Sequence, residues 1–274
     1  MTANDRCQGK TSTLSVIRLA ACSTTLLLME IAAFPGAGHR AEAPPGALPV
    51  LVELFTSEGC STCPPTDAML EQMDTQPLPG AQLIVLSEHV DYWDHDGWKD
   101  PYSSSSATDR QKEYVRALGL NTVYTPQIIV DGTSELQRGD PQRAKQLFQK
   151  VLAAVKIPVR ISSASVETRT PGVVRGRIEV DGNSEKNSAD IFVVLALDHA
   201  ESQVLRGENG GKHLRHVAVV QELKRIAKLE TGKNVIRDFE LKLKPGTDPT
   251  NVRIVAFVQE TGPGRVLGAA LRKL

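Results

Sequence analysis

Residues 50–65 read VLVELFTSEGCSTCPP, and this stretch decides how the first half of the chain is interpreted. Residues 50–55 form a short apolar run rich in β-formers, which predicts a buried strand. The two prolines after Cys63 suit the first turn of a helix, where a missing N–H costs no hydrogen bond. A thiolate is favoured at a helix N-terminus by the free N–H groups and the helix dipole. We therefore expect Cys60 to be the attacking thiol and Cys63 to resolve the mixed disulfide.

Strand and helix patterns alternate from residue 48 to residue 156, which is typical of an α/β sheet. The predicted strands cover 50–55, 83–86 and 127–130, and the predicted helices cover 62–73, 106–118 and 140–155. Residues 157–274 instead predict successive strands, at 160–168, 173–180, 191–197, 217–229, 235–243 and 252–258. The fold class predicted is an α/β domain followed by a mostly-β, sandwich-like domain. The run 217–229 also partly fits a helix.

The first 43 residues have the pattern of a secretory signal peptide. Arg6, Lys10 and Arg18 precede an apolar run over 19–34, and the sequence AEA at 41–43 fits a cleavage site. The alternative is an uncleaved N-terminal membrane anchor, but the run is shorter than the roughly 20 residues that a spanning helix needs. We expect a periplasmic or secreted protein without a stable membrane span after cleavage.

The cysteine count supports a redox interpretation. The chain has four cysteines, and signal cleavage would remove Cys7 and Cys22, leaving Cys60 and Cys63. A disulfide across two intervening residues closes a very small loop and stabilises the fold little. In an oxidising compartment, such a pair is therefore more consistent with redox activity than with a structural disulfide.

Composition excludes some classes of function. The chain has 274 residues, and 32 Lys and Arg balance 32 Asp and Glu, so there is no net charge to attract nucleic acid. A hydrophobic content of 41% and a charged content of 23% are typical of a soluble globular protein.

A polar loop follows the second predicted strand, and it carries His89, Asp91, Trp93 and Trp98. The carboxyl ends of parallel strands meet at one edge of a sheet, so this loop should lie near the cysteines. We expect it to form a substrate-binding rim, with Trp93 as an apolar platform and His89 as a proton carrier. The alternative is a solvated loop whose tryptophans cap a core.

Glu53 and Pro126 are further candidates for catalysis, and Thr125 is a candidate for substrate binding. Glu53 lies in the first apolar strand, where a buried carboxylate could accept the proton of Cys63. The alternative is a hydrogen-bonded strand residue that points away from the cysteines. Thr125 and Pro126 open the third strand, and the plain interpretation of Pro126 is an ordinary strand-edge proline.

A second polar loop lies between apolar strands at 198–216. It carries Glu208 and Asn209, together with His199, His213 and His216. We expect this loop to lie over or beside the cysteines, because binding groups favour loops held by a rigid scaffold. The alternative is a flap with no shared site.

The order of elements over 48–156 resembles the thioredoxin superfamily. Strand, C-x-x-C, helix, a second helix, Thr-Pro and a third strand occur in that sequence order. The resemblance implies a cis peptide bond before Pro126, with Pro126 packed against Cys60 and receiving the backbone of the substrate.

Five sequence blocks are similar to an exported bacterial family, domain-of-unknown-function family 1223. They are ELFTSEGCSTCPPTD at 53–67, HVDYWD at 89–94, GWKDP at 97–101, YTPQ at 124–127 and GEN at 207–209. The resemblance implies a thioredoxin-like domain and leaves the activity open.

These observations predict a thiol–disulfide oxidoreductase with Cys60 and Cys63 as its redox pair and no further cofactor. Its partner would be a protein or a small molecule that carries a thiol or disulfide. One alternative is a copper or zinc module that uses Cys60, Cys63 and His89. Another is a non-catalytic protein whose β domain binds a partner.

Overall fold

The computed structural model describes residues 46–274, with gaps at 77, 138, 168–171 and 183–187. The described residues belong to one compact unit. The predicted signal peptide, 1–43, lies outside the described residues. None of the helices described is long and apolar enough to cross a membrane.

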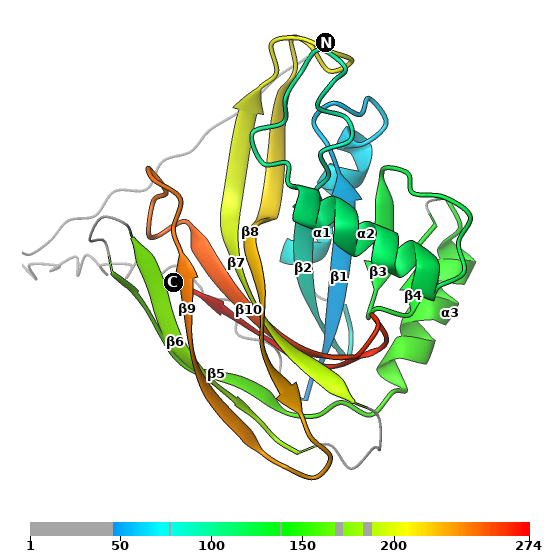
Figure 1. Ribbon diagram of the computed structural model, residues 1–274. Helices are drawn as coiled ribbons and strands as arrows, with labels where there is room; N and C mark the ends of the chain where they lie inside the picture. Colours follow the sequence, from blue (N-terminus) through cyan, green and yellow to red (C-terminus); the bar gives the residue numbers. More distant parts are fainter. Residues whose placement is uncertain (1–45, 77, 138, 168–171, 183–187) are drawn as a thin grey trace, which may run out of the picture. The chain divides into compact units, whose positions relative to one another are not determined.

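An eight-stranded mixed sheet organises the described chain (Figure 1). Its strand order is β11-β10-β7-β8-β2-β1-β3-β4. Its first four strands in sequence are β1 (Leu48–Thr56), β2 (Ala81–His89), β3 (Gln127–Val130) and β4 (Ser134–Glu135). The other four are β7 (Ala189–Gln203), β8 (His213–Leu229), β10 (Val252–Glu260) and β11 (Val266–Lys273). β1 and β2 are parallel, whereas β3 runs antiparallel to β1.

This sheet corrects the predicted fold class. A thioredoxin-like α/β domain followed by a separate mostly-β domain is wrong, because β8 pairs with β2 through Ser87 and Val219 and joins both halves of the chain in one sheet. The core is continuous as well, since Leu51 and Ile84 pack in one cluster with Phe257. Apolar periodicity identifies strands but does not say which strands pair, so the join could not be predicted. The helix alternative for 217–229 is also wrong, because the segment is part of β8.

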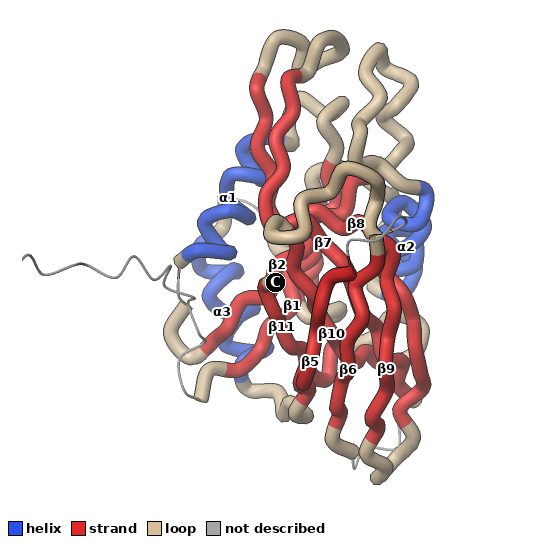
Figure 2. The backbone as a smooth tube through the Cα atoms, turned by 90° about the vertical axis from the view of Figure 1, so that its left-hand side faces the viewer, coloured by secondary structure: helices blue, strands red, loops and turns tan. Residues whose placement is uncertain are grey.

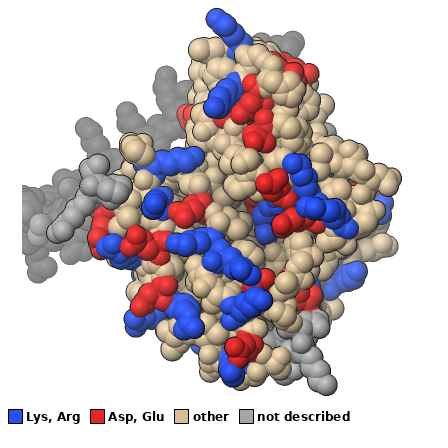
Figure 3. Space-filling model, viewed as in Figure 1, with Lys and Arg blue, Asp and Glu red and all other residues tan. Residues whose placement is uncertain are grey.

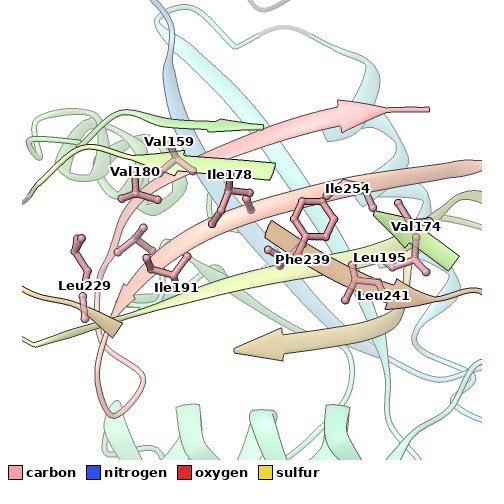
Figure 4. Close-up of a cluster of buried hydrophobic side chains, with 14 of the residues drawn as sticks. Val159, Val174, Ile178, Val180, Ile191, Leu195, Leu229, Phe239, Leu241 and Ile254 are labelled. Atoms are coloured by element: carbon pink, nitrogen blue, oxygen red, sulfur yellow. The ribbon is translucent and has the colours of Figure 1, made fainter. Parts of the chain in front are cut away.

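A second, three-stranded sheet packs on the half of the large sheet that β7 and β10 form (Figures 2 and 4). Its strands are β5 (Val159–Glu167), β6 (Val173–Val180) and β9 (Val235–Lys242). Ile178 and Phe239 from the small sheet meet Ile191 and Ile254 from the large one in a buried cluster. The second half of the chain thus contributes to two packed sheets, but the larger sheet also contains strands from the first half.

The described helices cover both faces of the large sheet, and they are α1 (Pro64–Thr75), α2 (Ser105–Ala117) and α3 (Pro141–Leu152). Side chains alternate along β1, so Val52 and Leu54 pack with Leu70 of α1 and Val151 of α3. The next residue, Phe55, points the other way and packs with α2. The ends of β1 and β2 therefore sit between helices on opposite faces.

Charged side chains of both signs are interspersed on the face shown in Figure 3. Arg177 pairs with Asp238, and Arg160 pairs with Asp181, across exposed positions of the small sheet. Such exposed pairs contribute little to stability, so the packed sheets must supply most of it.

Candidate active site at a buried disulfide

Cys60 and Cys63 form a disulfide at the end of β1, with their Cα atoms 5.4 Å apart. Cys63 is the N-cap residue of α1, which begins at Pro64. The disulfide therefore lies where helix N–H groups and the helix dipole favour negative charge. Both cysteines are buried, with exposed fractions of 1% for Cys60 and 0% for Cys63. Cys60, the predicted attacking thiol, is therefore nearly as buried as Cys63.

The segment before β3 covers one side of the disulfide. The Thr125–Pro126 peptide bond is cis, as the resemblance implied. The carbonyl oxygen of Thr125 lies 3.8 Å from Cys60 Sγ, and the indole N–H of Trp93 donates to Thr125 Oγ1 at 2.8 Å. Trp93 also packs on Gly59, where an added Cβ would lie 3.0 Å from the Trp93 Cβ. These contacts place Trp93 and Thr125 beside the cysteines.

The loop between β7 and β8 covers the other side of the disulfide. The side-chain amide of Asn209 donates to the carbonyl oxygens of Glu58 and Cys60, at 2.8 and 2.9 Å. The backbone N–H of Ser61 donates to Glu208 Oε2 at 2.9 Å. Asn209 is fully buried. The expectation that this loop lies beside the cysteines is confirmed by these contacts.

Gly207 lets the two polar loops approach closely. Its φ of +75° is unfavourable for other residues, and a Cβ there would lie 3.1 Å from the carbonyl oxygen of Asp96 and 3.2 Å from the Trp98 Cβ. The loop after β2 and the loop before β8 therefore pack backbone against backbone. Of the three histidines near the second loop, only His216 is buried; His199 and His213 are exposed.

His89 makes a buried side-chain contact with Asp100. Its Nδ1 lies 2.7 Å from Asp100 Oδ2, and the same carboxylate oxygen accepts the backbone N–H of Glu58 at 2.9 Å. Burial favours the neutral acid, but the adjacent His89 and the donated N–H groups lower the pKa of Asp100 overall. The indole N–H of Trp98 donates to Glu58 Oε2 at 2.8 Å. Both residues hold the segment that leads into the cysteines.

His216, from β8, lies against this arrangement. Its Nε2 is 3.3 Å from Glu58 Oε1, its Nδ1 is 3.8 Å from Asp67 Oδ1, and its ring centroid is 4.7 Å from that of His89. Burial opposes a charge on the imidazole, but Asp67 and Glu58 outweigh it and raise the pKa of His216 to about 9. His216 is therefore a buried cation between two carboxylates at neutral pH.

Glu53 and Asp91 make their contacts elsewhere. Glu53 faces α2, where it accepts hydrogen bonds from Arg110 Nε at 2.6 Å and from the Tyr114 hydroxyl at 2.5 Å. Strand alternation explains this placement, because its neighbours in β1 point toward α1 and the cysteine-bearing turn. Asp91 accepts from the Thr108 hydroxyl at 2.6 Å and so holds the start of α2. The structure brings neither carboxylate to the sulfur atoms.

Three of the buried charged groups were not among the predicted site residues: Glu58, Asp67 and Asp100. Glu58 and Asp67 flank the two cysteines in the sequence. This proximity is the sequence signal that could have identified them as site residues. Among the described residues, no three or more His, Cys, Asp or Glu side chains are grouped so that they could hold a metal ion.

A cavity of about 830 Å³ lies on the α2 side of the sheet, away from the disulfide. Arg110 and Glu88 line it from the first half of the chain, and Phe192 and Leu223 line it from the second. Burial raises the pKa of Glu88 well above its usual range, although Arg110 opposes the shift. Neither cysteine lines this cavity, although His89, which contacts Asp100, does.

Comparison with solved structures supports the fold. The chain resembles protein AGR_C_4864 from Agrobacterium tumefaciens, with 26% identity and a TM-score of 0.63, over 82% of this chain and 94% of that one. It also resembles HBP35 of Porphyromonas gingivalis, with 14% identity and a TM-score of 0.59, over 83% of this chain and 76% of that one. The second likeness concerns the fold alone. No curated protein matches the sequence.

A family whose description is "Protein of unknown function (DUF1223)" matches residues 51–259. The match includes the disulfide, both polar loops and all strands from β2 to β9, and it takes in most of the chain. It agrees with the resemblance found in the sequence blocks around the cysteines. The chain therefore belongs to the DUF1223 family.

Proposed function

We propose that this chain is an exported thiol–disulfide oxidoreductase that uses Cys60 and Cys63 as its redox pair, without a further cofactor. The observation that carries the proposal is the position of the disulfide, at the end of a buried strand and at the N-terminus of α1. A cysteine thiol in this position becomes more acidic and hence more reactive. The predicted leader favours the periplasm or the exterior, where disulfides persist.

In the direction that reduces the chain, a substrate thiolate attacks Cys60 Sγ and the electron pair of the S–S bond leaves on Cys63 Sγ, which takes up a proton. A second substrate thiolate then attacks the substrate sulfur of the mixed disulfide. The substrate disulfide forms, and Cys60 leaves as a thiolate. Two substrate thiols are oxidised and one protein disulfide is reduced. The reverse sequence oxidises the chain.

The burial of the disulfide limits which substrates can reach Cys60. Cys60 is 1% exposed beneath Trp93 and the Asn209 loop. A small thiol needs only a local opening to reach Cys60 Sγ, whereas a protein substrate requires the loop that carries Glu208 and Asn209 to move aside. We therefore propose small thiols or flexible peptide segments as the substrate class.

The test measures exchange between the oxidised protein and mixtures of reduced and oxidised glutathione. We expect Cys63→Ser to accumulate a mixed disulfide at Cys60, and Cys60→Ser to accumulate none at Cys63. Ser61→Ala, between the two cysteines, is the matched control and should exchange like the wild type. The proposal is wrong if the wild-type disulfide stays unchanged across the full range of glutathione ratios, or if only Cys60→Ser traps the adduct.

A further inference from the structure

Unsatisfied buried atoms concentrate on one side of the disulfide. In the described ranges, eight buried side-chain oxygen and nitrogen atoms make no hydrogen bond, and seven of them belong to six residues around His216. The six are Thr56, Glu58, Asp67, Ser87, His89 and His216. Buried polar groups are normally satisfied, so a cluster of this kind needs a functional explanation.

The strand register brings these residues together. Thr56 of β1 pairs with His89 of β2, and Ser87 lies two residues earlier on the same face of β2. Ser87 is in turn the partner of Val219, three residues beyond His216 on β8. The cluster therefore lies on the α1 face, beneath the first turn of the helix that Cys63 caps.

The two carboxylates that hold His216 bracket the cysteines. Glu58 is two residues before Cys60, and its carbonyl oxygen shares the Asn209 amide with that of Cys60. Asp67 is four residues after Cys63, and its backbone N–H donates to the Cys63 carbonyl at 3.1 Å. The two carboxylates that contact His216 are thus carried by residues at either end of the redox loop.

The groups that face His216 come from each element packed on it. Glu58 comes from the segment after β1 and Asp67 from α1. The ring of His89, backed by Asp100, comes from β2, and the ring of Tyr102 lies 6.1 Å away, centroid to centroid. His216 is the cation that balances Glu58 and Asp67.

We propose that His216 is a positioning residue for the Cys60–Cys63 pair: its positive charge, held between Glu58 and Asp67, offsets these carboxylates and so stabilises the Cys60 thiolate. This proposal rests on the proposed function. When the disulfide is reduced, the released Cys60 thiolate adds a negative charge two residues after Glu58 and at the N-terminus of the helix that carries Asp67. Without the cation these like charges disfavour the thiolate, so the thiol pKa rises and the disulfide form gains stability.

His216→Gln tests the proposal in the reduced protein. We expect the rate of Cys60 alkylation at pH 7 to fall about tenfold, which corresponds to one unit in the pKa of the thiol. The equilibrium with glutathione should shift toward the disulfide by about the same factor, or about 30 mV. His213→Gln, at an exposed position of the same strand, is the matched control and should change neither value.

Glu58→Gln provides a test of opposite sign. In this variant the side-chain amide oxygen at position 58 still accepts the Trp98 N–H, but one of the two carboxylates is absent. Cys60 alkylation should therefore become faster than in the wild type. Structural damage would move both variants in the same direction, whereas a charge effect moves them apart. Combining Glu58→Gln and Asp67→Asn with His216→Gln should restore alkylation to near the wild-type rate. This arm also keeps the test decisive should His216→Gln alone fail to fold.

Failure of this proposal is distinct from failure of the proposed function. Glutathione exchange in the wild type, with unchanged Cys60 alkylation in His216→Gln, would reject the role of His216 and retain the redox pair. Slower alkylation in both His216→Gln and Glu58→Gln would likewise reject it. Absence of any exchange in the wild type would reject the proposed function and, with it, this inference.

Discussion

Asn209 donates a hydrogen bond to the carbonyl oxygen of Cys60 across 149 positions of sequence, at a distance of 2.9 Å. The same amide also reaches the carbonyl of Glu58. One side chain from the second half of the chain thus fixes the backbone on which the first cysteine sits, and the redox loop cannot move without breaking this contact.

Asn209→Ala should therefore lower the stability of the fold and make the disulfide more accessible to thiol reagents. Two buried carbonyls lose their donor, so we expect the free energy of unfolding to fall by about 1–3 kcal/mol. The rate at which a thiol reagent reduces the disulfide should rise at the same time. Glu208→Ala, at an exposed neighbour, should leave the unfolding midpoint in urea nearly unchanged. Equal loss of stability in both variants would contradict the assignment of Asn209 as the anchor.

Gly207→Ala should loosen the contact between the two polar loops. Gly207 and Gly211 both have positive φ, but only Gly207 faces backbone within 3.4 Å. We expect either substitution to cost about 1 kcal/mol from backbone strain, and Gly207→Ala to cost more and to raise disulfide accessibility. Thermal unfolding and the rate of reduction check this. Identical behaviour of the two variants would show that the close approach is unimportant.

His216 should make stability depend on pH in a defined window. The folded pKa of about 9 lies above the unfolded value of about 6.5, so the folded state holds the proton more tightly. Its contribution is fully present below pH 6.5 and is lost as pH rises through 9. It can reach about 3 kcal/mol. Urea unfolding of the wild type at pH 6.5 and 9 should show this loss, and His216→Gln should show a much smaller one. A parallel decline in both would refute the assignment.

Glu53→Gln should destabilise the fold without affecting the cysteines. It removes the carboxylate that pairs with buried Arg110, a change that costs about 3 kcal/mol or more. Glu88→Gln should cost less, because burial raises the pKa of Glu88 well above its usual range and so favours the neutral acid over the carboxylate. The Cys60 alkylation rate should remain at the wild-type value in both variants. A selective fall of this rate in Glu53→Gln would restore Glu53 as a base for the cysteines.

The sequence predicted local features well and long-range pairing poorly. The strand, C-x-x-C and helix near residues 50–75 were predictable because apolar runs and prolines act over a few positions. The placement of Asn209 beside Cys60 was expected from the polar character of its loop. The parallel pairing of Ser87 with Val219 was not predictable, since nothing in either strand identifies its partner.

The buried charges were harder to predict than the loops. Glu53 was expected near the cysteines because it is close to them in sequence, but strand alternation turns it toward Arg110. His216 acquires its role only through Glu58 and Asp67, which reach it from two other elements. A residue whose partners are distant in sequence gives no local signal.

The joining of both halves in one sheet has a consequence for synthesis. When residues up to about 156 have been made, β2 still has an open edge, because β8 is its neighbour in the finished sheet. The cysteines are then uncovered as well, since Asn209 has not yet been added. The cysteine pair is therefore more accessible during this interval than in the finished sheet. A fragment that ends near residue 156 would keep this immature state, with an exposed strand edge prone to aggregation.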